Sequence, residues 1–174
     1  HALRAVLDRF KARGLTPVCA VEMEFFLIDD SGRKLQVPLS PRSGKRRKGA
    51  ETLSIRALDQ FDEFFTDLYD ACEEMDIPAD TAISEAGLGQ FEISVLDTTG
   101  NNVFDNGGPE GTDIMRHAVA GCLEAMAGSA LIFAPHANSF ERMVPGSHAP
   151  TGVSWAYENR TSSIRIPSGN HKAR

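Results

Sequence analysis

The sequence predicts an α+β domain in which helices pack on one side of a mostly antiparallel, curved sheet. Stretches with apolar residues at helical spacing open the chain and recur in its middle. Other segments are rich in Val, Phe and Ile and are bounded by turn residues. A length of 174 residues, 41% of them hydrophobic, is enough for one buried core. We therefore expect residues 1–174 to form a single domain.

Three helices are expected from the spacing of apolar residues. The first covers residues 2–12 and is followed by Gly14, a common stopping residue. Ser54 is a suitable N-cap for a second, long helix that continues to Met75. The third covers about 112–127, and its apolar side is predicted to comprise Ile114, Ala118, Cys122 and Met126.

Strands are expected where β-branched and aromatic residues are bounded by turn residues. The first, residues 18–28, leads into the turn Asp29–Gly32, which returns the chain as a hairpin. Residues 39–51 contain prolines and glycines without periodicity and are predicted to form a surface loop. The other expected strands cover residues 34–37, 81–84, 90–95 and 163–166, and the tail from Ala130 is otherwise irregular.

Composition excludes several classes of function. The formal net charge of −6 argues against a general nucleic-acid-binding protein, although the basic run Lys45–Lys48 leaves a nucleic-acid arm as an alternative. Such runs are usually solvated, and no aromatic residue interrupts this one. The three cysteines form no CxxC pair, which favours a reducing cytoplasm. No apolar run reaches the length of a membrane span and no leader opens the chain, so we expect a soluble protein without membrane contact.

Two pairs of acidic residues are candidates for a metal site. Alternation along the first strand places Glu22 and Glu24 on one face, about 7 Å apart at their α-carbons. A divalent cation would relieve the repulsion between such carboxylates, but an edge strand with a solvated polar face explains the same pattern. Glu85 and Glu92 flank a glycine-bearing loop that could fold one towards the other. Together the four acids are suited to a two-cation site that holds phosphate oxygens.

Basic residues gather near the end of the sequence. Arginine binds carboxylates and phosphates through two parallel hydrogen bonds, although surface arginines are common. The combination with the acidic strands makes phosphoryl transfer the favoured chemistry. The residues concerned are Arg142, Arg160, Arg165, Lys172 and Arg174.

Three ordered motifs resemble those of the glutamine synthetase family. They are Glu22-Met23-Glu24-Phe25-Phe26, Gly89-Gln90-Phe91-Glu92, and Asn159 to Pro167 with the sequence NRTSSIRIP. Phe133-Ala134-Pro135 and Val144-Pro145-Gly146 are also similar to the family, so the resemblance extends along nearly the whole chain. It is nearest to the members that make γ-glutamyl amides of polyamines and other amines.

The resemblance implies a role for each candidate residue. Glu22 would ligate the cation on the ATP phosphates, and Glu24, Glu85 and Glu92 would ligate a second cation near glutamate, either Mg²⁺ or Mn²⁺. Arg142 would hold the glutamate carboxylate and Arg160 would stabilise the phosphoryl group in transfer. Arg165, Lys172 and Arg174 would lie beside the nucleotide phosphates.

The implied reaction has two steps. ATP phosphorylates the γ-carboxylate of glutamate, and an amine or ammonia then displaces phosphate from the γ-glutamyl phosphate. The implied assembly is a ring of identical subunits, with a dodecamer as the expected size and an active site between neighbours.

The sequence also departs from the family. Roughly fifty residues, including a metal-binding histidine, have no counterpart at the junction of Ile93 and Ser94. The N-terminal β-grasp domain is absent, and the chain stops at Arg174, before the last glutamate ligand. The catalytic domain is therefore incomplete, and we expect the 174 residues alone to be inactive. We interpret the junction as an unobserved segment of a larger protein rather than a natural deletion.

One departure bears on the substrate. His148 stands where glutamine synthetases that use ammonium carry a glutamate, which favours a substituted amine as the acceptor. The alternatives are a true glutamine synthetase that uses ammonia and a non-catalytic scaffold of the same family. A guanidino kinase is less consistent with the two acidic pairs.

Overall fold

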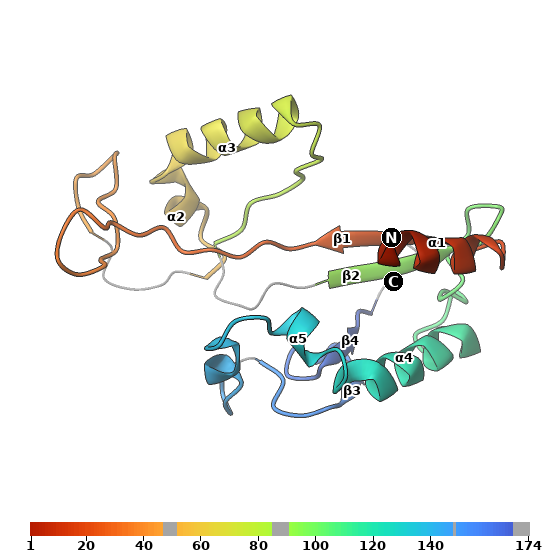
Figure 1. Cartoon of the computed structure of the whole chain (residues 1–174). Helices are drawn as coiled ribbons and strands as arrows, with labels where there is room; N and C mark the ends of the chain where they lie inside the picture. The colour runs from red at the N-terminus through yellow and green to blue at the C-terminus, as the bar shows by residue number, and fades with distance from the viewer. Residues whose placement is uncertain (47–51, 85–90, 148, 169–174) are drawn as a thin grey trace. The chain divides into compact units, whose positions relative to one another are not determined.

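The computed structural model describes residues 1–46, 52–84, 91–147 and 149–168, with the side chain of Arg142 left out (Figure 1). The chain divides into two compact units. The first comprises His1–Met23 with Gly89–Arg174, and the second is the intervening segment Glu24–Leu88. The single domain expected over residues 1–174 stays a prediction.

The first unit opens with helix α1, Ala2–Lys11, as predicted for residues 2–12. The backbone N–H of Gly14 donates to the carbonyl of Lys11 at 3.0 Å, and Gly14 itself has a φ of +67°. Glycine adopts this left-handed conformation without the steric cost that a Cβ would add. The turn therefore ends α1 and directs the chain into strand β1.

Strand β1, Thr16–Val21, pairs antiparallel with strand β2, Phe91–Leu96, in the register Thr16↔Leu96 to Val21↔Phe91 (Figure 1). The predicted strand over residues 90–95 is thus confirmed within one residue for the part that is described. The predicted strand over residues 18–28 is wrong at both ends, because the paired backbone starts at Thr16 and stops at Val21.

A second sheet contains strands β3, Trp155–Tyr157, and β4, Ile164–Ile166, which pair in parallel. The sequence predicted β4 within one residue and missed β3. The described sheets are therefore two pairs, one antiparallel and one parallel, where one mostly antiparallel sheet was expected. Helices α4, Asp113–Met126, and α5, Ala130–Phe133, and the 3₁₀ helix η1, Ser139–Arg142, precede β3.

The core of the first unit lies between α4 and β4. Met115, Val119 and Ile166 are buried there, with Phe104 and Leu123 packed against them. The stripe predicted from Ile114 to Met126 is displaced by one residue, because the side chain of Ile114 is 52% exposed while Met115 is buried. Adjacent positions of a helix offer two apolar stripes, and contact with Ile166 selects the one that contains Met115.

Thr112 is the N-cap of helix α4. The hydroxyl of Thr112 accepts from the backbone N–H of Met115 at 3.2 Å and donates to the carbonyl of Val103 at 2.7 Å. It satisfies one of the free N–H groups of the first turn and also fixes the preceding loop to the helix. The predicted helix over 112–127 is confirmed in position and length.

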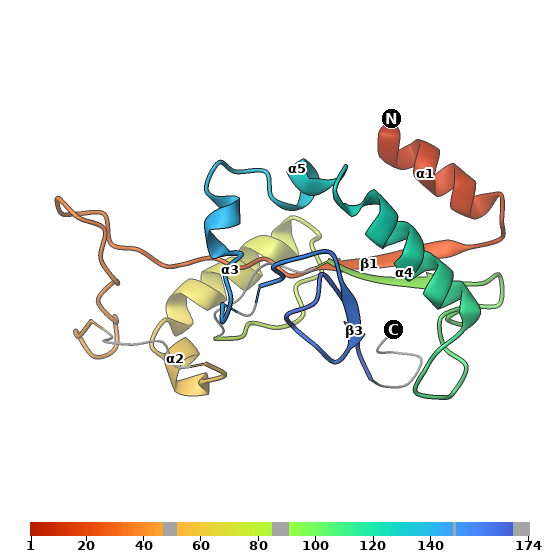
Figure 2. The same cartoon turned by 90° about the horizontal axis from the view of Figure 1, so that it is seen from below.

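The second unit contains helices α2, Ile55–Asp59, and α3, Asp62–Glu74, which follow one another directly (Figure 2). Ser54 caps α2 as predicted, since its side chain accepts from Ala57 N–H at 3.2 Å. The prediction of one continuous helix to Met75 is wrong, because Phe61 has non-helical angles of −129° and 32°. Asp62 and Glu63 then supply the negative charge that a new helix N-terminus favours.

In the second unit, hydrogen bonds connect the predicted hairpin to the predicted loop that follows it. Asp29 and Gln36 exchange both backbone hydrogen bonds, at 2.8 and 3.1 Å, which confirms the return of the chain. The predicted strand over residues 34–37 is wrong, because Gln36 forms only an isolated bridge. Arg46, part of the basic run, donates to the carboxylate of Asp29 at 2.6 Å and to the carbonyl of Val37. Ser40 is buried and its hydroxyl accepts from Ser43 N–H at 3.1 Å, so residues 39–46 of the loop are held by their own contacts.

The predicted strand over residues 81–84 is absent from the described backbone. Among the described residues, no helix combines the length and the apolar character that crossing a bilayer requires.

The close approach at Gly111 gives a test of the core. Gly111 has a φ of +67°, and an added Cβ would lie 2.8 Å from the Phe104 carbonyl oxygen and 2.7 Å from the terminal methyl of Met115. We expect Gly111→Ala to lower the free energy of unfolding by about 1–2 kcal/mol through the left-handed backbone alone, and further through the clash. Gly107→Ala is the matched control, because its φ is +76° and nothing lies within 4 Å. Urea denaturation of the intact protein measures both, and equal losses would contradict the packing described here.

The contacts of Asp29 give a second test. Hydrogen bonds from the Ser31 hydroxyl and then from Arg46 lower the pKa of Asp29 from 3.8 to about 2. Because the folded pKa lies below the unfolded value, the stabilisation is complete above about pH 4 and is lost as the pH falls towards 2. We expect Ser31→Ala and Arg46→Gln each to raise this pKa in a carboxyl NMR titration. Lys34→Gln serves as the control, and an unchanged pKa in Ser31→Ala would contradict the assignment.

Candidate functional site

The β1–β2 register brings two of the predicted metal ligands to the same end of one sheet. Glu92 lies directly opposite Ala20, and the side chains of paired residues share a face. Glu22 follows the last pair, Val21↔Phe91, by one residue. Both acids are exposed. Two carboxylates thus lie near the point where regular pairing of β1 ends.

The other two predicted ligands, Glu24 and Glu85, do not belong to the described β1–β2 ladder. Glu24 belongs to the second unit, and β1 has ended before Glu22, so the predicted strand face that Glu22 and Glu24 would share is not formed. Glu85 falls outside the described residues. Across the parts of the chain that the structure describes, no three His, Cys, Asp or Glu side chains gather into a metal-binding group. The four-carboxylate site therefore stays a prediction.

Two of the predicted arginines, Arg160 and Arg165, belong to the second sheet and its connecting loop. Arg165 is the central residue of β4 and pairs with Ala156 of β3. Its neighbours Ile164 and Ile166 pack into the core, so alternation along the strand directs Arg165 away from it. Arg160 lies in the loop between β3 and β4, and Arg142 is the last residue of η1. Lys172, Arg174 and His148 lie outside the described residues.

The loop that carries Arg160 has a defined shape. The side-chain oxygen of Asn159 accepts from the N–H and the hydroxyl of Thr161, at 3.0 and 2.8 Å. The N–H of Ser162 donates to the carbonyl of Asn159 at 3.2 Å. These bonds form an Asx turn that contains Arg160. The backbone of the arginine is therefore held within a tight turn.

Glu158 is a residue of this region that the sequence reasoning missed. Its carboxylate accepts from the N–H of Ser168, and this bond, followed by that of the Ser168 hydroxyl, lowers its pKa. The positive charges of Arg165 and Arg160 lower the pKa further. The sequence signal that could have identified Glu158 is an acidic residue directly before the Asn159-Arg160 motif. The structure thus associates one carboxylate with both described arginines of the β3–β4 region.

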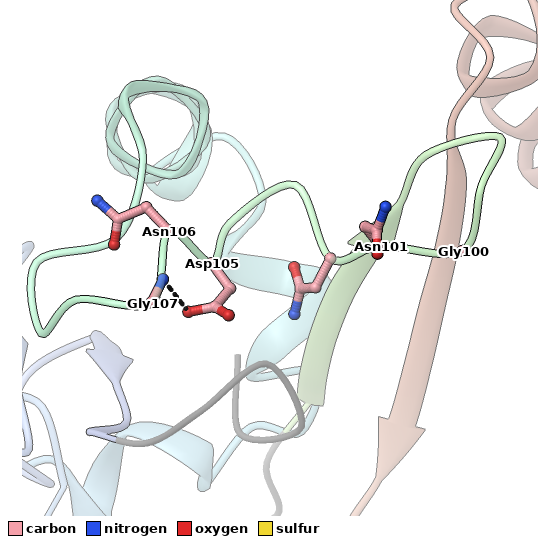
Figure 3. A pocket seen from close by; sticks show the side chains of 6 residues that line it. Gly100, Asn101, Asp105, Asn106 and Gly107 are labelled. Atoms are coloured by element: carbon pink, nitrogen blue, oxygen red, sulfur yellow. Dashed lines mark hydrogen bonds between the residues drawn. The ribbon is translucent and has the colours of Figure 1, made fainter.

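A separate hollow of about 460 Å³ lies beside the turn that follows β2 (Figure 3). Asp97 shapes this turn by accepting from the N–H and hydroxyl of Thr99 at 2.8 and 2.7 Å, which lowers the pKa of its carboxyl. Figure 3 shows Asp105 directed at the N–H of Gly107, a contact of 3.2 Å. These side chains accept hydrogen bonds from backbone N–H groups of the loop. None of the predicted site residues lines the hollow.

Comparison with known proteins identifies the family. The model described as "Glutamine synthetase, catalytic domain" matches residues 1–106 and 93–174. Gamma-glutamylputrescine synthetase PuuA of Escherichia coli (strain K12) is 28% identical over 230 residues, which cover 99% of this chain and 49% of the relative. Gamma-glutamylethanolamide synthetase GlnA4 of Streptomyces coelicolor is 45% identical over 82 residues, 47% of this chain and 18% of the relative. A glutamine synthetase of Thermotoga maritima is 23% identical over 225 residues, 99% of this chain and 50% of the relative.

The lengths of these alignments are informative. The chain spans about half the length of the two relatives that it matches from end to end. Both alignments are longer than the 174 residues of the chain, so each relative has aligned positions without a counterpart here. The two matched segments of the family model cover every residue from His1 to Arg174, and the chain belongs to the glutamine synthetase family.

Proposed function

We propose that the intact protein containing this chain is an ATP-dependent ligase that joins the γ-carboxylate of glutamate to an amine. The observation that carries the proposal is the match of the family's catalytic domain along the whole chain, which includes the Asn159–Pro167 motif around β4. Two relatives whose names denote γ-glutamyl-amine synthesis support an amine rather than ammonia as the acceptor. His148 at the position of the expected glutamate supports the same choice.

The proposed reaction proceeds in two displacements. A γ-carboxylate oxygen of glutamate attacks the γ-phosphorus of ATP, and the bond to ADP breaks. The amine nitrogen then attacks the acyl carbon, inorganic phosphate leaves with the carboxylate oxygen, and the nitrogen loses a proton. Dividing the condensation in this way replaces one difficult step by two accessible ones.

The chain's own residues have distinct tasks in this scheme. Arg160 neutralises charge on the phosphoryl group in transfer, and Arg142 binds the carboxylate of glutamate. Arg165, Lys172 and Arg174 bind the nucleotide phosphates. A neutral His148 attracts an ammonium ion less than a glutamate would, and so tolerates a larger amine.

The acidic residues suit Mg²⁺ or Mn²⁺, because their donors are carboxylate oxygens. Glu92 lies opposite Ala20 near the end of the β1–β2 pairing, and Glu22 follows that end by one residue. In the proposal Glu24 and Glu85 complete the set. A cation held there would supply positive charge to the phosphate oxygens. The ligands predicted in this chain are all carboxylates, and the positions that the relatives add are proposed to contribute the remaining ones.

The proposal extends to the whole molecule. We propose that the chain is part of a larger, cytoplasmic polypeptide that assembles into a ring, with a dodecamer as the expected size. The exposure of Leu131 and Ile132 on α5, 79% and 73%, supports further contacts at this surface. Intact mass and sedimentation test both points. A monomer with a mass near 18.9 kDa would contradict them, and a ring of subunits at least twice as heavy would agree.

Metal binding can be tested without turnover. We expect Glu92→Gln in the intact protein to weaken Mn²⁺ binding at least tenfold, about 1.4 kcal/mol, since the amide lacks the negative charge. Titration calorimetry measures the affinity. Glu124→Gln, an exposed residue of α4, is the control and should bind as the wild type does. Equal affinity in the two variants would remove Glu92 from the proposed site.

The acceptor can be tested by competition among amines. With glutamate and ATP, we expect phosphate release to be faster with putrescine, ethanolamine or methylamine than with ammonium. His148→Glu should shift the ratio of kcat/KM values towards ammonium by about tenfold, or 1.4 kcal/mol. His117→Glu on α4 is the control for an added acid. A wild-type preference for ammonium would establish ammonia as the substrate, and no phosphate release with any amine would favour a non-catalytic protein.

A further inference from the structure

We propose that Asn106 is a site of covalent self-modification: assisted by Asp105, the backbone nitrogen of Gly107 displaces the side-chain amide of Asn106 as ammonia, and the asparagine becomes an acid. The sequence contains one Asn-Gly step, residues 106–107, and both residues line the hollow beside the turn that follows β2 (Figure 3). The inference is independent of the proposed ligase activity, because the reaction needs only this chain and water.

The reaction closes a five-membered ring within the chain. The nitrogen of Gly107 attacks Cγ of Asn106, the N–Cγ bond forms, and the attacking nitrogen loses its proton. The Cγ–Nδ2 bond then breaks, and Nδ2 leaves with one added proton as ammonia. Water adds to either carbonyl carbon of the resulting succinimide and reopens the ring, to aspartate or to isoaspartate.

The attacking nitrogen is unshielded. Glycine has no Cβ beside its backbone nitrogen. No heavy atom of a non-adjacent residue lies within 4 Å of the position that a Cβ of Gly107 would take, and Asn106 and Gly107 are both exposed. Every other asparagine of the sequence is followed by a residue with a side chain. The Asn106-Gly107 step is therefore the most open one to ring closure.

Asp105 supplies a proton acceptor for the attacking nitrogen. Its Oδ1 accepts from the N–H of Gly107 at 3.2 Å (Figure 3). Proton transfer to a general base requires a separation of about 2.6–3.2 Å between the heavy atoms. The carboxylate is thus placed to take the proton as the N–Cγ bond forms and to return it to the departing nitrogen.

Gly108 supplies a donor for the oxygen on which negative charge develops. Attack at Cγ moves the carbonyl electrons of Asn106 onto Oδ1, and the N–H of Gly108 donates to this oxygen at 2.9 Å. Donors at about 2.7–3.1 Å stabilise an oxyanion of this kind. The same bond folds the side chain of Asn106 back over the backbone that contains the nitrogen of Gly107.

Conversion removes a contact that holds the start of α4. Nδ2 of Asn106 donates to the carbonyl of Gly111 at 2.7 Å, directly before the cap Thr112. An ionised acid at position 106 has no hydrogen to donate, so two acceptor oxygens would face each other. The new charge also lies next to Asp105, and like charges so close repel. The modification therefore loosens the start of α4 and the packing of Met115.

Ageing of the intact protein in mildly alkaline buffer tests the modification, with peptide mass spectrometry as the measurement. We expect Asn106 to lose ammonia and gain water before Asn101 and Asn138, which are controls within the same molecule. The rate in the folded protein should be at least that in urea, because unfolding separates the base and the donor from the reacting atoms. Slower conversion in the folded protein, or earlier conversion of either control, would overturn the proposal.

The variant Asp105→Ala separates assistance from loop stability. Loss of a contact that only steadies the loop would speed conversion, whereas loss of the proton acceptor slows it. We expect conversion about tenfold slower, a small part of what a general base supplies in enzymes. Glu110→Gln removes another carboxylate of the same loop and should convert at the wild-type rate. Equal or faster conversion in Asp105→Ala would overturn the role of Asp105.

The variant Asn106→Asp tests the structural consequence, because it carries the charge of the product. Asn138→Asp is the matched control, since Asn138 is exposed and makes no side-chain cap bond to η1. We expect a lower melting temperature in Asn106→Asp than in Asn138→Asp. Equal melting temperatures would overturn the proposed loosening of α4.

Discussion

The antiparallel pairing of β1 with β2 is the contact on which the first unit depends. It joins Thr16–Val21 to Phe91–Leu96, and closing so long a loop has an entropic cost that the six-residue ladder must offset. Helix α1 leads into this ladder. Beyond it, the turn shaped by Asp97 leads to the Thr112 cap and so to the core beneath α4. The position of Glu92 relative to Glu22 is a direct result of the register.

The second sheet has a comparable role at smaller scale. Only three residue pairs join β3 to β4, and the buried side chain of Ile166 connects them to Met115 and Val119. The arginine of β4 is presented by the same backbone that anchors the core. Sites built on such anchored strands hold their side chains more firmly than sites on free loops. The position of Arg165 thus depends on the packing of Ile166.

Local signals in the sequence were reliable where short-range chemistry decides the structure. The cap at Ser54 was predicted because a hydroxyl before an apolar run satisfies free helix N–H groups, and the helix predicted from Thr112 begins within one residue of its observed start. The break at Phe61 and the end of β1 at Val21 were not readable, because neither residue breaks the apolar pattern around it. The buried stripe of α4 was missed by one position, since the partner that selects it, Ile166, comes some fifty residues later.

The candidate site also contains residues that the sequence predicted and residues that it did not. The motif that contains Arg160 and Arg165 was recognisable from its letters, and the Asx turn of Asn159 follows from its side chain. Glu158 was not recognisable, because its contacts arise from the pairing of β3 with β4 and from a left-handed backbone that glutamate rarely adopts. The grouping of Glu22, Glu24, Glu85 and Glu92 as metal ligands stays a prediction, and one of the four, Glu85, lies outside the described residues.

The β1–β2 ladder has a further consequence for handling the molecule. One of its faces carries Val21, Phe91 and Ile93, which are 64%, 58% and 54% exposed, although Phe133 makes an edge-to-face contact with Phe91. Two-stranded ladders are marginally stable alone, and their unpaired edges with apolar side chains are templates for intermolecular strand addition. Recombinant production of these 174 residues would therefore favour inclusion bodies.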